Sequence, residues 1–222
     1  MIDIWHQYGP ALLSGLGVTV ELLCASTAMA MLIGLVGAVL VLWGPRFLRV
    51  LTSIYIQFIR STPAVVILFI VFYGLPEVGI ILPVFAAAAV ALAFYGGAYF
   101  VEIIRGGFIA VDPGQWEAGY ALGLKRVAIL QKVIVPQAVP TMLPPAVNMI
   151  ADLLKATSLV VVIGMGDLMN EAYIAVSESY RAMEIFAVAG AMYLAIALPL
   201  IWLIGKLERA AARYRTRERV QA

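Results

Sequence analysis

The chain has 222 residues, of which 64% are hydrophobic and 13% are charged, and its formal net charge is +2. Soluble domains are about half apolar, so this composition excludes an ordinary water-soluble fold and indicates an all-α integral membrane protein. The small net charge excludes a strongly basic nucleic-acid-binding surface, and the single cysteine, Cys24, excludes an internal disulfide framework.

Five apolar stretches are long enough to cross the hydrocarbon core as helices, which takes about 20 residues. Their approximate bounds are residues 20–43, 51–75, 78–101, 139–169 and 185–205, within one transmembrane domain over residues 1–222. No Lys or Arg precedes Arg46, whereas a cleavable signal peptide begins with a basic segment. We therefore expect the first stretch to be a permanent helix.

Basic residues gather after the first stretch, between the third and fourth, and after the fifth. They are Arg46, Arg49, Arg105, Lys125, Arg126, Lys132, Lys206, Arg209, Arg213, Arg215, Arg217 and Arg219, and Arg60, near the start of the second stretch, is expected on the same side. The segments on the other side contain only Arg181. Because Lys and Arg near the ends of spans mark the cytoplasmic side, we expect the N-terminus outside and the C-terminus in the cytoplasm.

The second stretch contains the sequence Arg60-Ser61-Thr62-Pro63. Proline removes a helical hydrogen bond and its ring clashes with the preceding turn. We therefore predict a kink at Thr62 and Pro63. A kink that borders a solute pathway and a kink that is only structural are both compatible with this pattern.

The loop over residues 105–138 is the longest internal one. Asp112 is placed to cap a helix, Pro113 suits its first position, and Gln115 stands where a capping box has Glu or Gln. Gly123 is placed to supply the left-handed residue that ends a helix. This pattern predicts a short cytoplasmic helix.

A second helical segment is expected from Leu124 to Val135, with Pro136 at its end. Two short helices at an angle, with Trp116 and Tyr120 exposed, would form a projecting knob. It is either a connector that lies in solvent or at the lipid interface, or a docking surface with aromatic anchors for a cytoplasmic protein.

The fourth stretch contains a polar series, Asn148, Asp152 and Lys155, at spacings that place all three on one helix face. Ionisable groups at membrane depth must be paired or face water. Two interpretations are open. Asp152 and Lys155 form an ion pair near the helix end that joins two subunits, or the polar series, with Thr157 and Ser158, lines a pathway and contacts the carboxylate and ammonium groups of a solute. A helix break should follow, at Gly164, Gly166 and Asp167.

Four segments carry a resemblance to a known family. "EAGYALG" followed by "KVIVPQA" resembles the EAA loop of ABC-importer permeases. The segments "FIRSTPAVVILFIVFYGLP", "YFVEIIRGGFIAVDPGQWEAGYALG", "LPPAVN" and "LLKATSLVVVIG" are similar to the polar amino acid uptake permeases of the His/Gln/Arg type. The resemblance extends from about Gly17 to Leu207, with the motifs in the family's order.

The chain departs from the family pattern at five positions. Gly119 replaces the second Ala of the EAA motif, Val135 stands where Leu is usual, and Ser61 replaces a Gly. Ile67 and Pro140 stand where the family often has Gln and a basic residue. The last two positions bear on substrate choice and on partner contact.

The resemblance implies the MetI-like permease fold in a bacterial inner membrane. It also implies an importer that comprises two permease copies, two cytoplasmic ABC ATPases and an extracytoplasmic solute-binding protein. The residues that contact the ATPase would be Gln115, Trp116, Glu117, Ala118, Gly119, Tyr120, Leu122, Gly123 and Pro136. The residues along the substrate pathway would be Thr62, Pro63, Asn148, Asp152, Lys155, Thr157 and Ser158.

The sequence contains no G-x-x-x-x-G-K-[S/T] motif for nucleotide phosphates. We therefore expect no cofactor, metal or catalytic residue in this chain, with ATP and Mg²⁺ bound by the partner ATPase. Five spans without an internal repeat hardly enclose a pathway alone, so a two-fold dimer with an identical or a sister permease is expected. The alternative function is a subunit of an ion-coupled secondary transporter.

Overall fold

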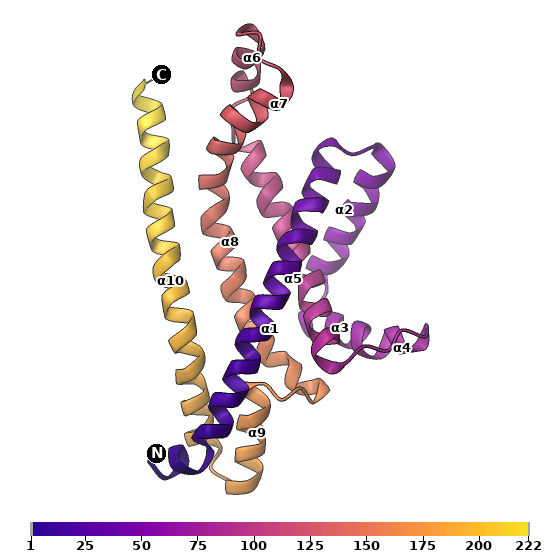
Figure 1. Ribbon diagram of the computed structural model, residues 1–222, viewed down its shortest axis with the longest axis vertical. Helices are drawn as coiled ribbons and strands as arrows, with labels where there is room; N and C mark the ends of the chain where they lie inside the picture. The colour runs from indigo at the N-terminus through magenta and orange to yellow at the C-terminus, as the bar shows by residue number, and fades with distance from the viewer. Residues whose placement is uncertain (1, 222) are drawn as a thin grey trace.

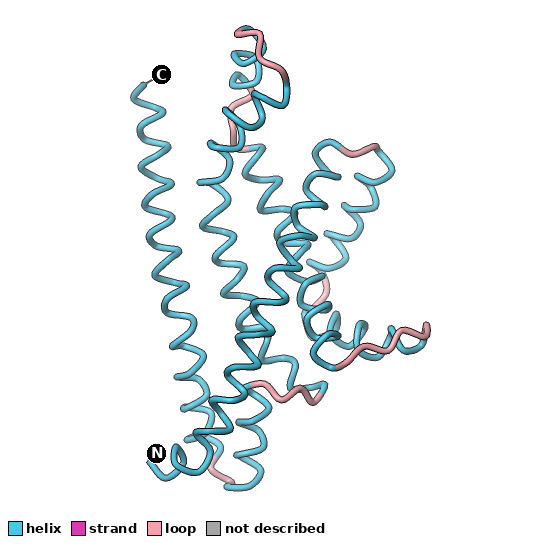
Figure 2. Tube along the Cα trace, in the orientation of Figure 1, coloured by secondary structure: helices cyan, strands magenta, loops and turns pink. Residues whose placement is uncertain are grey.

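The computed structural model describes the backbone of residues 2–221 and the side chains of residues 3–209. Within this part every regular element is a helix (Figures 1 and 2). Four helical stretches are long and apolar enough to cross a membrane: residues 3–43, 84–109, 126–163 and 182–209. A bent pair of helices over residues 46–77 makes a fifth if it is counted as one span.

Helix α1 runs from Ile2 to Trp43, so it begins well before the predicted start at residue 20. Its first turns are buried through Ile4, Tyr8 and Leu12, which pack in one cluster with residues of the last two helices. The spacing of four residues places these three side chains on one helix face. Hydropathy alone missed this segment because tertiary packing stabilises it.

The second predicted span is broken. Helix α2 (Arg46–Ser61) is followed by α3 (Ala64–Phe69), the π-helical turn η1 (Ile70–Gly74) and α4 (Leu75–Glu77). The two parts meet at an angle of 114°. Thr62 is extended, as a residue before proline prefers. The predicted bend at Thr62-Pro63 is present, but it is too sharp for one straight span over residues 51–75.

Helix α5 (Val84–Ile109) is the centre of the bundle. It begins six residues later than the predicted 78, because Gly79 is left-handed and Pro83 precedes the first turn. Its buried face is rich in Ala and Gly, and α1 packs directly against it. A Cβ at Gly97 would lie 2.6 Å from Cγ2 of Ile33, so this contact requires glycine.

The chain then forms α6 (Gly114–Ala121), α7 (Arg126–Ile129), the π-helical turn η2 (Leu130–Ile134) and α8 (Val135–Thr157). A 3₁₀ helix, η3 (Ser158–Ile163), ends at Gly164, whose φ is +71°. The predicted break after the fourth span is therefore present. The span itself differs from residues 139–169, since the helical stretch begins at Arg126 and ends at Ile163.

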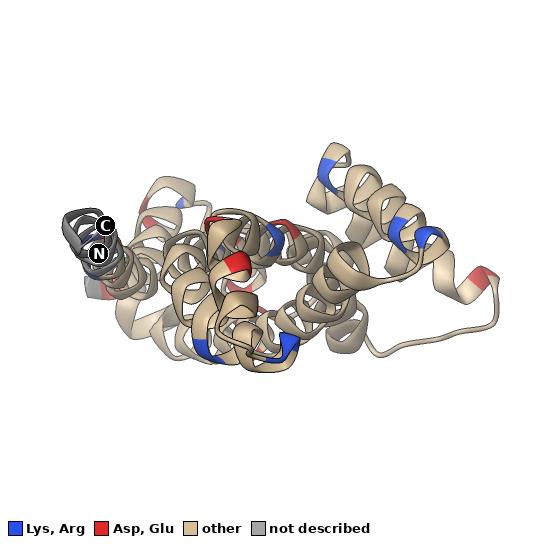
Figure 3. Cartoon of the chain, turned by 90° about the horizontal axis from the view of Figure 1, so that it is seen from above, with Lys and Arg blue, Asp and Glu red and all other residues tan. Residues whose placement is uncertain are grey.

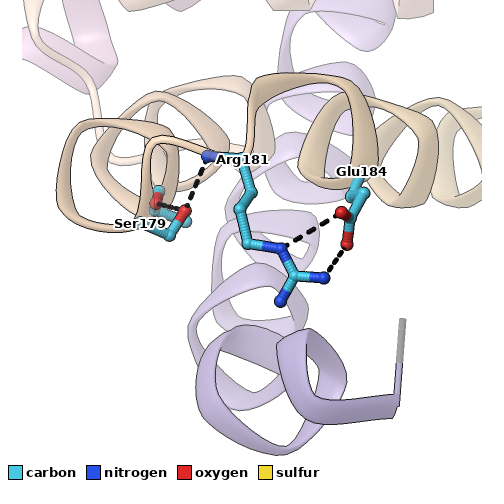
Figure 4. Close-up of polar contacts among 4 residues, drawn as sticks. Ser179, Arg181 and Glu184 are labelled. Atoms are coloured by element: carbon cyan, nitrogen blue, oxygen red, sulfur yellow. Dashed lines mark hydrogen bonds and ion pairs between the residues drawn. The ribbon is translucent and has the colours of Figure 1, made fainter.

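Helix α9 (Leu168–Ser179) leads into α10 (Ala182–Gln221) through Tyr180, which is left-handed with φ of 58°. Arg181 pairs with Glu184 in the first turn of α10, and its backbone N–H donates to Ser179 Oγ at 3.3 Å (Figure 4). The basic residue at this end is therefore neutralised locally. Helix α10 begins three residues before the predicted span 185–205 and continues beyond it.

The two ends of the molecule contain different helices and different chain termini. Helices α6 and α7 lie at the same end as the C-terminus, whereas the N-terminus and α9 lie at the opposite end (Figure 1). Figure 3 shows the molecule along its long axis with Lys and Arg in blue, and two of these residues, Arg46 and Arg49, lie in the first turn of α2. The arrangement matches the expected topology, in which α6, α7 and the C-terminus share the cytoplasmic side.

Candidate functional site

The knob formed by α6 and α7 is held by one very close contact. Gly119 of α6 is buried, and a Cβ built on it would lie 2.7 Å from Cγ1 of Ile129 in α7. Ile129 is itself fully buried, in a cluster with Ile134 and Ala138. The departure of Gly119 from the Ala of the EAA pattern thus has a physical cause, because the helix cannot approach Ile129 with a side chain there.

Both ends of α6 are defined by local hydrogen bonds. Asp112 Oδ1 accepts from the Gly114 N–H at 2.7 Å, although the helix begins at Gly114 rather than at Pro113. Gly123 is left-handed with φ of +73°, and the Leu124 N–H donates to the Gly119 carbonyl at 3.1 Å. This is the predicted glycine stop.

Gln115 does not form the predicted capping box. Its Oε1 accepts from Nε2 of Gln137 at 3.1 Å, which ties α6 to the first turn of α8. The correction follows from tertiary contact, since Gln137 offers the amide a partner outside α6. Gln115 therefore holds the knob against the long helix behind it.

Pro136 does not end a helix, contrary to the prediction. It lies in the first turn of α8, directly after η2, and the helical path continues through it. In η2 the Val135 N–H donates to the Leu130 carbonyl, five residues back. The wider π turn accommodates a proline ring that would clash with a regular helical turn. Pro136 is exposed.

The residues of α6 and of the turn that follows it divide into an inner and an outer set. Trp116 is half-buried, packs in the cluster of Ile129 and stacks on Tyr120 with 6.5 Å between ring centroids. The outer set is exposed and consists of Glu117, Ala118, Tyr120, Leu122 and Gly123. Leu122 is 78% exposed and Tyr120 is 53% exposed, which is unusual for such apolar side chains on a charged end of the molecule. We call these five residues the outer surface of α6.

A second group of predicted residues lies on one face of α8. Asn148, Asp152 and Lys155 are all exposed, and Lys155 Nζ is 2.7 Å from Asp152 Oδ1. The predicted ion pair is therefore present within the helix. We call Asn148, Asp152 and Lys155 the polar face of α8.

Thr157 does not share that face. Its side chain is fully buried, and its hydroxyl donates to the Leu154 carbonyl at 2.6 Å. Ser158 is half-buried and donates to the Lys155 carbonyl at 2.7 Å. With Lys155 and Tyr193 it lines a recess of about 310 Å³ between α8 and α10. The α-helical spacing accounts for both positions: Thr157 lies about 200° round the helix from Lys155 and faces inward, whereas Ser158, about 300° round, lies near the polar face.

Thr62 and Pro63 form the break between α2 and α3, where the Thr62 hydroxyl donates to the Phe58 carbonyl at 2.7 Å. Next to this break is a charged cluster that the sequence showed only in part. Glu102 and Arg105, three residues apart on α5, form a bidentate pair at 2.9 and 2.7 Å. Arg60 joins it from α2, with its Nη1 3.7 Å from Glu102 Oε2.

A buried polar cluster, which the sequence did not predict, lies at the end of the molecule opposite α6 and α7. Asp167 is fully buried, and its carboxylate accepts from the Asn170 N–H at 3.0 Å and from the Tyr193 hydroxyl at 3.3 Å. The Leu168 N–H donates to Thr19 Oγ1 at 3.1 Å. The cluster joins α1, α9 and α10. The one signal in the sequence was an Asp directly before a helix, where it serves as an N-cap.

Comparison with known proteins agrees with this geometry. Residues 30–213 match the family described as binding-protein-dependent transport system inner membrane component. The chain is 35% identical to the arginine transport system permease protein ArtQ of Bacillus subtilis, over 90% of this chain and 92% of that protein. It is 33% identical to the glutamine transport system permease protein GlnP of Escherichia coli, over 93% and 94%.

Solved structures show the same fold. A crystal structure of an amino acid ABC transporter with histidines superposes with a TM-score of 0.85 and 36% identity, covering 92% of this chain and 95% of that one. An inward-facing structure of the MetNI methionine ABC transporter shares the fold alone, with a TM-score of 0.73 and 20% identity over 90% of this chain and 95% of that one.

The fold and the site define the class of non-catalytic, membrane-spanning permease subunits of ABC transporters. The chain belongs to the family of binding-protein-dependent transport system inner membrane components. In this family the permease forms the membrane passage, and a partner ATPase hydrolyses ATP.

Proposed function

We propose that this chain is the permease subunit of an importer that passes a polar amino acid from an extracytoplasmic binding protein to the cytoplasm. The observation that carries the mechanism is the outer surface of α6. It exposes apolar side chains at the basic end of the molecule, on a helix fixed to the bundle through Gly119 and Ile129. Relatives named for arginine and glutamine transport support the substrate class.

The outer surface of α6 would bind a groove of the ABC ATPase. Tyr120 and Leu122 would be the apolar anchors, and Glu117 would be a charged contact at the rim. Trp116 and Gln115 would act behind this surface, since their side chains contact α7 and α8. When the ATPase binds ATP and Mg²⁺ and moves, it would move α6 with it. The contacts of Gln115 and Trp116 would then displace the first turn of α8.

The polar face of α8 would line the solute pathway, together with Ser158 and the break at Thr62 and Pro63. Exposed charges on a helix within an apolar span require a second protein surface or water. A second permease copy, identical or a sister chain, would supply the opposite wall. Asp152 and Lys155 would then contact the ammonium and carboxylate groups of the solute, or would join the two copies directly.

Reconstitution in proteoliposomes tests this function. The permease, its ATPase and the binding protein are assembled, and uptake of each of the twenty amino acids is measured with and without ATP. We expect uptake of one or a few polar amino acids only when all three components and ATP are present. Ionophores that remove ion gradients should leave the rate unchanged. Uptake by the permease without the ATPase, or loss of uptake with ionophores, would instead support an ion-coupled transporter.

A further inference from the structure

A groove with a volume of about 490 Å³ lies between α1, α2 and α5, away from the sites described above. Its walls include Leu32, Val36 and Leu40 of α1, Leu51 of α2 and Phe94 of α5. From Leu32 to Leu40 it follows α1 for about 12 Å, at 1.5 Å per residue. The groove is therefore elongated along the direction in which lipid chains run.

The groove presents almost no free polar atom. The Tyr55 hydroxyl donates to the Phe94 carbonyl at 2.6 Å, and the Thr52 hydroxyl donates to the Leu48 carbonyl at 2.8 Å. Both hydroxyls that line it are thus already bonded within the protein. A polar solute would gain nothing from such walls, whereas a hydrocarbon chain would lose no hydrogen bond there.

Two arginines stand at one end of the groove. Arg46 and Arg49 occupy the first turn of α2, beside the groove residues Leu48 and Leu51 in the chain, and both are exposed. Arg49 Nη2 contacts only the Gly44 carbonyl, at 3.4 Å, and neither arginine has an acidic partner among the described side chains. The sequence contains no Asp or Glu between Glu21 and Glu77. An anion that neutralises Arg46 and Arg49 must therefore come from outside this part of the chain.

We propose that the groove binds an acyl chain of an anionic phospholipid of the cytoplasmic leaflet, and that Arg46 and Arg49 bind its phosphate. Basic residues at the cytoplasmic end of an intramembrane recess have the charge and the depth that such a headgroup needs. A second permease copy fits the groove less well. The groove is walled by α1, α2 and α5, whereas the second copy is proposed to face the polar side chains of α8.

The test compares lipid retention by the full chain in nanodiscs and by native mass spectrometry. The wild type should retain phosphatidylglycerol in preference to phosphatidylcholine. R46Q/R49Q should retain it about tenfold to thirtyfold less, as expected for the loss of two cations near a headgroup. The matched control K206Q/R209Q removes two exposed cations of α10 from the same side and should retain it like the wild type. Leu51→Trp, which fills the groove, should also lower retention without loss of thermal stability.

A photo-crosslinker identifies the occupant directly. In a Cys24→Ser background, the Val36→Cys variant is labelled at its new cysteine with a benzophenone, which places the photoreactive group in the groove. After irradiation the mass of the cross-linked product is measured by mass spectrometry. We expect the mass of one anionic phospholipid. A cross-linked pair of chains would show that a second copy covers the groove and would overturn the proposal. So would equal retention of both lipids, unchanged retention in R46Q/R49Q, or displacement of the lipid by inorganic phosphate at millimolar concentration.

Discussion

Ile129 leaves no room for a side chain at position 119: a Cβ there would lie 2.7 Å from its Cγ1 and 2.8 Å from its Cδ1. Because Ile129 is fully buried, it can move only by disturbing its own cluster. The contact makes α6 and α7 one rigid piece. It also explains why the second alanine of the EAA pattern is absent from this chain.

Gly119→Ala should loosen the knob by about 1–3 kcal/mol, the usual cost of overpacking. Ile129→Ala alone creates a cavity and should cost about 2–5 kcal/mol. In the double variant the new methyl group occupies part of that cavity, so its cost should be smaller than the sum. Thermal unfolding and the rate of trypsin cleavage after Lys125 and Arg126 measure this coupling. Additive costs would show that the two residues do not restrict each other.

Glu117→Lys should abolish ATP-driven uptake while the protein remains in the membrane. The side chain is exposed, so the change leaves the packing of α6 intact, and reversal of a charge within an interface costs at least about tenfold in affinity. Uptake and membrane content are measured in the same cells. Glu208→Lys is the matched control, since Glu208 is an exposed acid on α10. Equal uptake by Glu117→Lys and the wild type would remove α6 from the coupling surface.

Lys155→Gln should raise the substrate concentration at half-maximal uptake by about tenfold or more, because a hydrogen bond to a charged group contributes about 1.5–3 kcal/mol. The Lys155 side chain is exposed in the single chain, and its ammonium group is paired with Asp152. The measurement is uptake against substrate concentration, paired with the yield of permease dimer. A loss of dimer with unchanged affinity would assign the pair to the interface between copies.

Asp167 should make stability depend on pH. Burial raises the pKa of its carboxyl above the ordinary value of about 3.9. A carboxyl with a raised folded-state pKa binds its proton more tightly in the folded state than in the unfolded one. Its contribution to stability is therefore fully present below pH of about 3.9 and is lost as the pH rises through the folded-state pKa.

Asp167→Asn keeps an oxygen for the Asn170 N–H and removes the buried charge. The variant should lose the pH dependence in this window and melt at or above the wild-type temperature at pH 7. Asp167→Ala should melt lower at every pH, because the cap is worth about 1 kcal/mol. Thermal scans from pH 4 to pH 7 check both. A wild type and an Asn variant with parallel pH profiles would show that Asp167 does not titrate in this range.

Several features could be predicted because they depend on residues close together in the chain. The break at Thr62-Pro63, the stop at Gly123 and the break at Gly164 follow from the backbone preferences of proline and glycine. The pairs Asp152–Lys155 and Glu102–Arg105 follow from helical spacing. In each case the interacting groups lie within one or two helical turns.

Other features required contacts between distant segments. Residue Gln115 bonds to Gln137 instead of capping its own helix, and Arg60 reaches Glu102 from another helix. The π turn that carries the helix through Pro136 likewise has no signature in residue type alone. Spacing within a helix gives no information about such partners, so the predictions there were wrong or incomplete.

The sequence by itself determined that this protein is an all-helical membrane permease. Hydropathy, the distribution of basic residues and the EAA motif can each be recognised from composition and from residues close together in the chain. Only the tertiary structure decided which residues of that motif face outward and which hold it in place. Trp116 and Gly119 turn inward because α7 and α8 pack behind them, whereas Tyr120 and Leu122 are left exposed. Whether a side chain on a helix is buried depends on which other segment packs against that face. The packing partner is determined only when the chain folds.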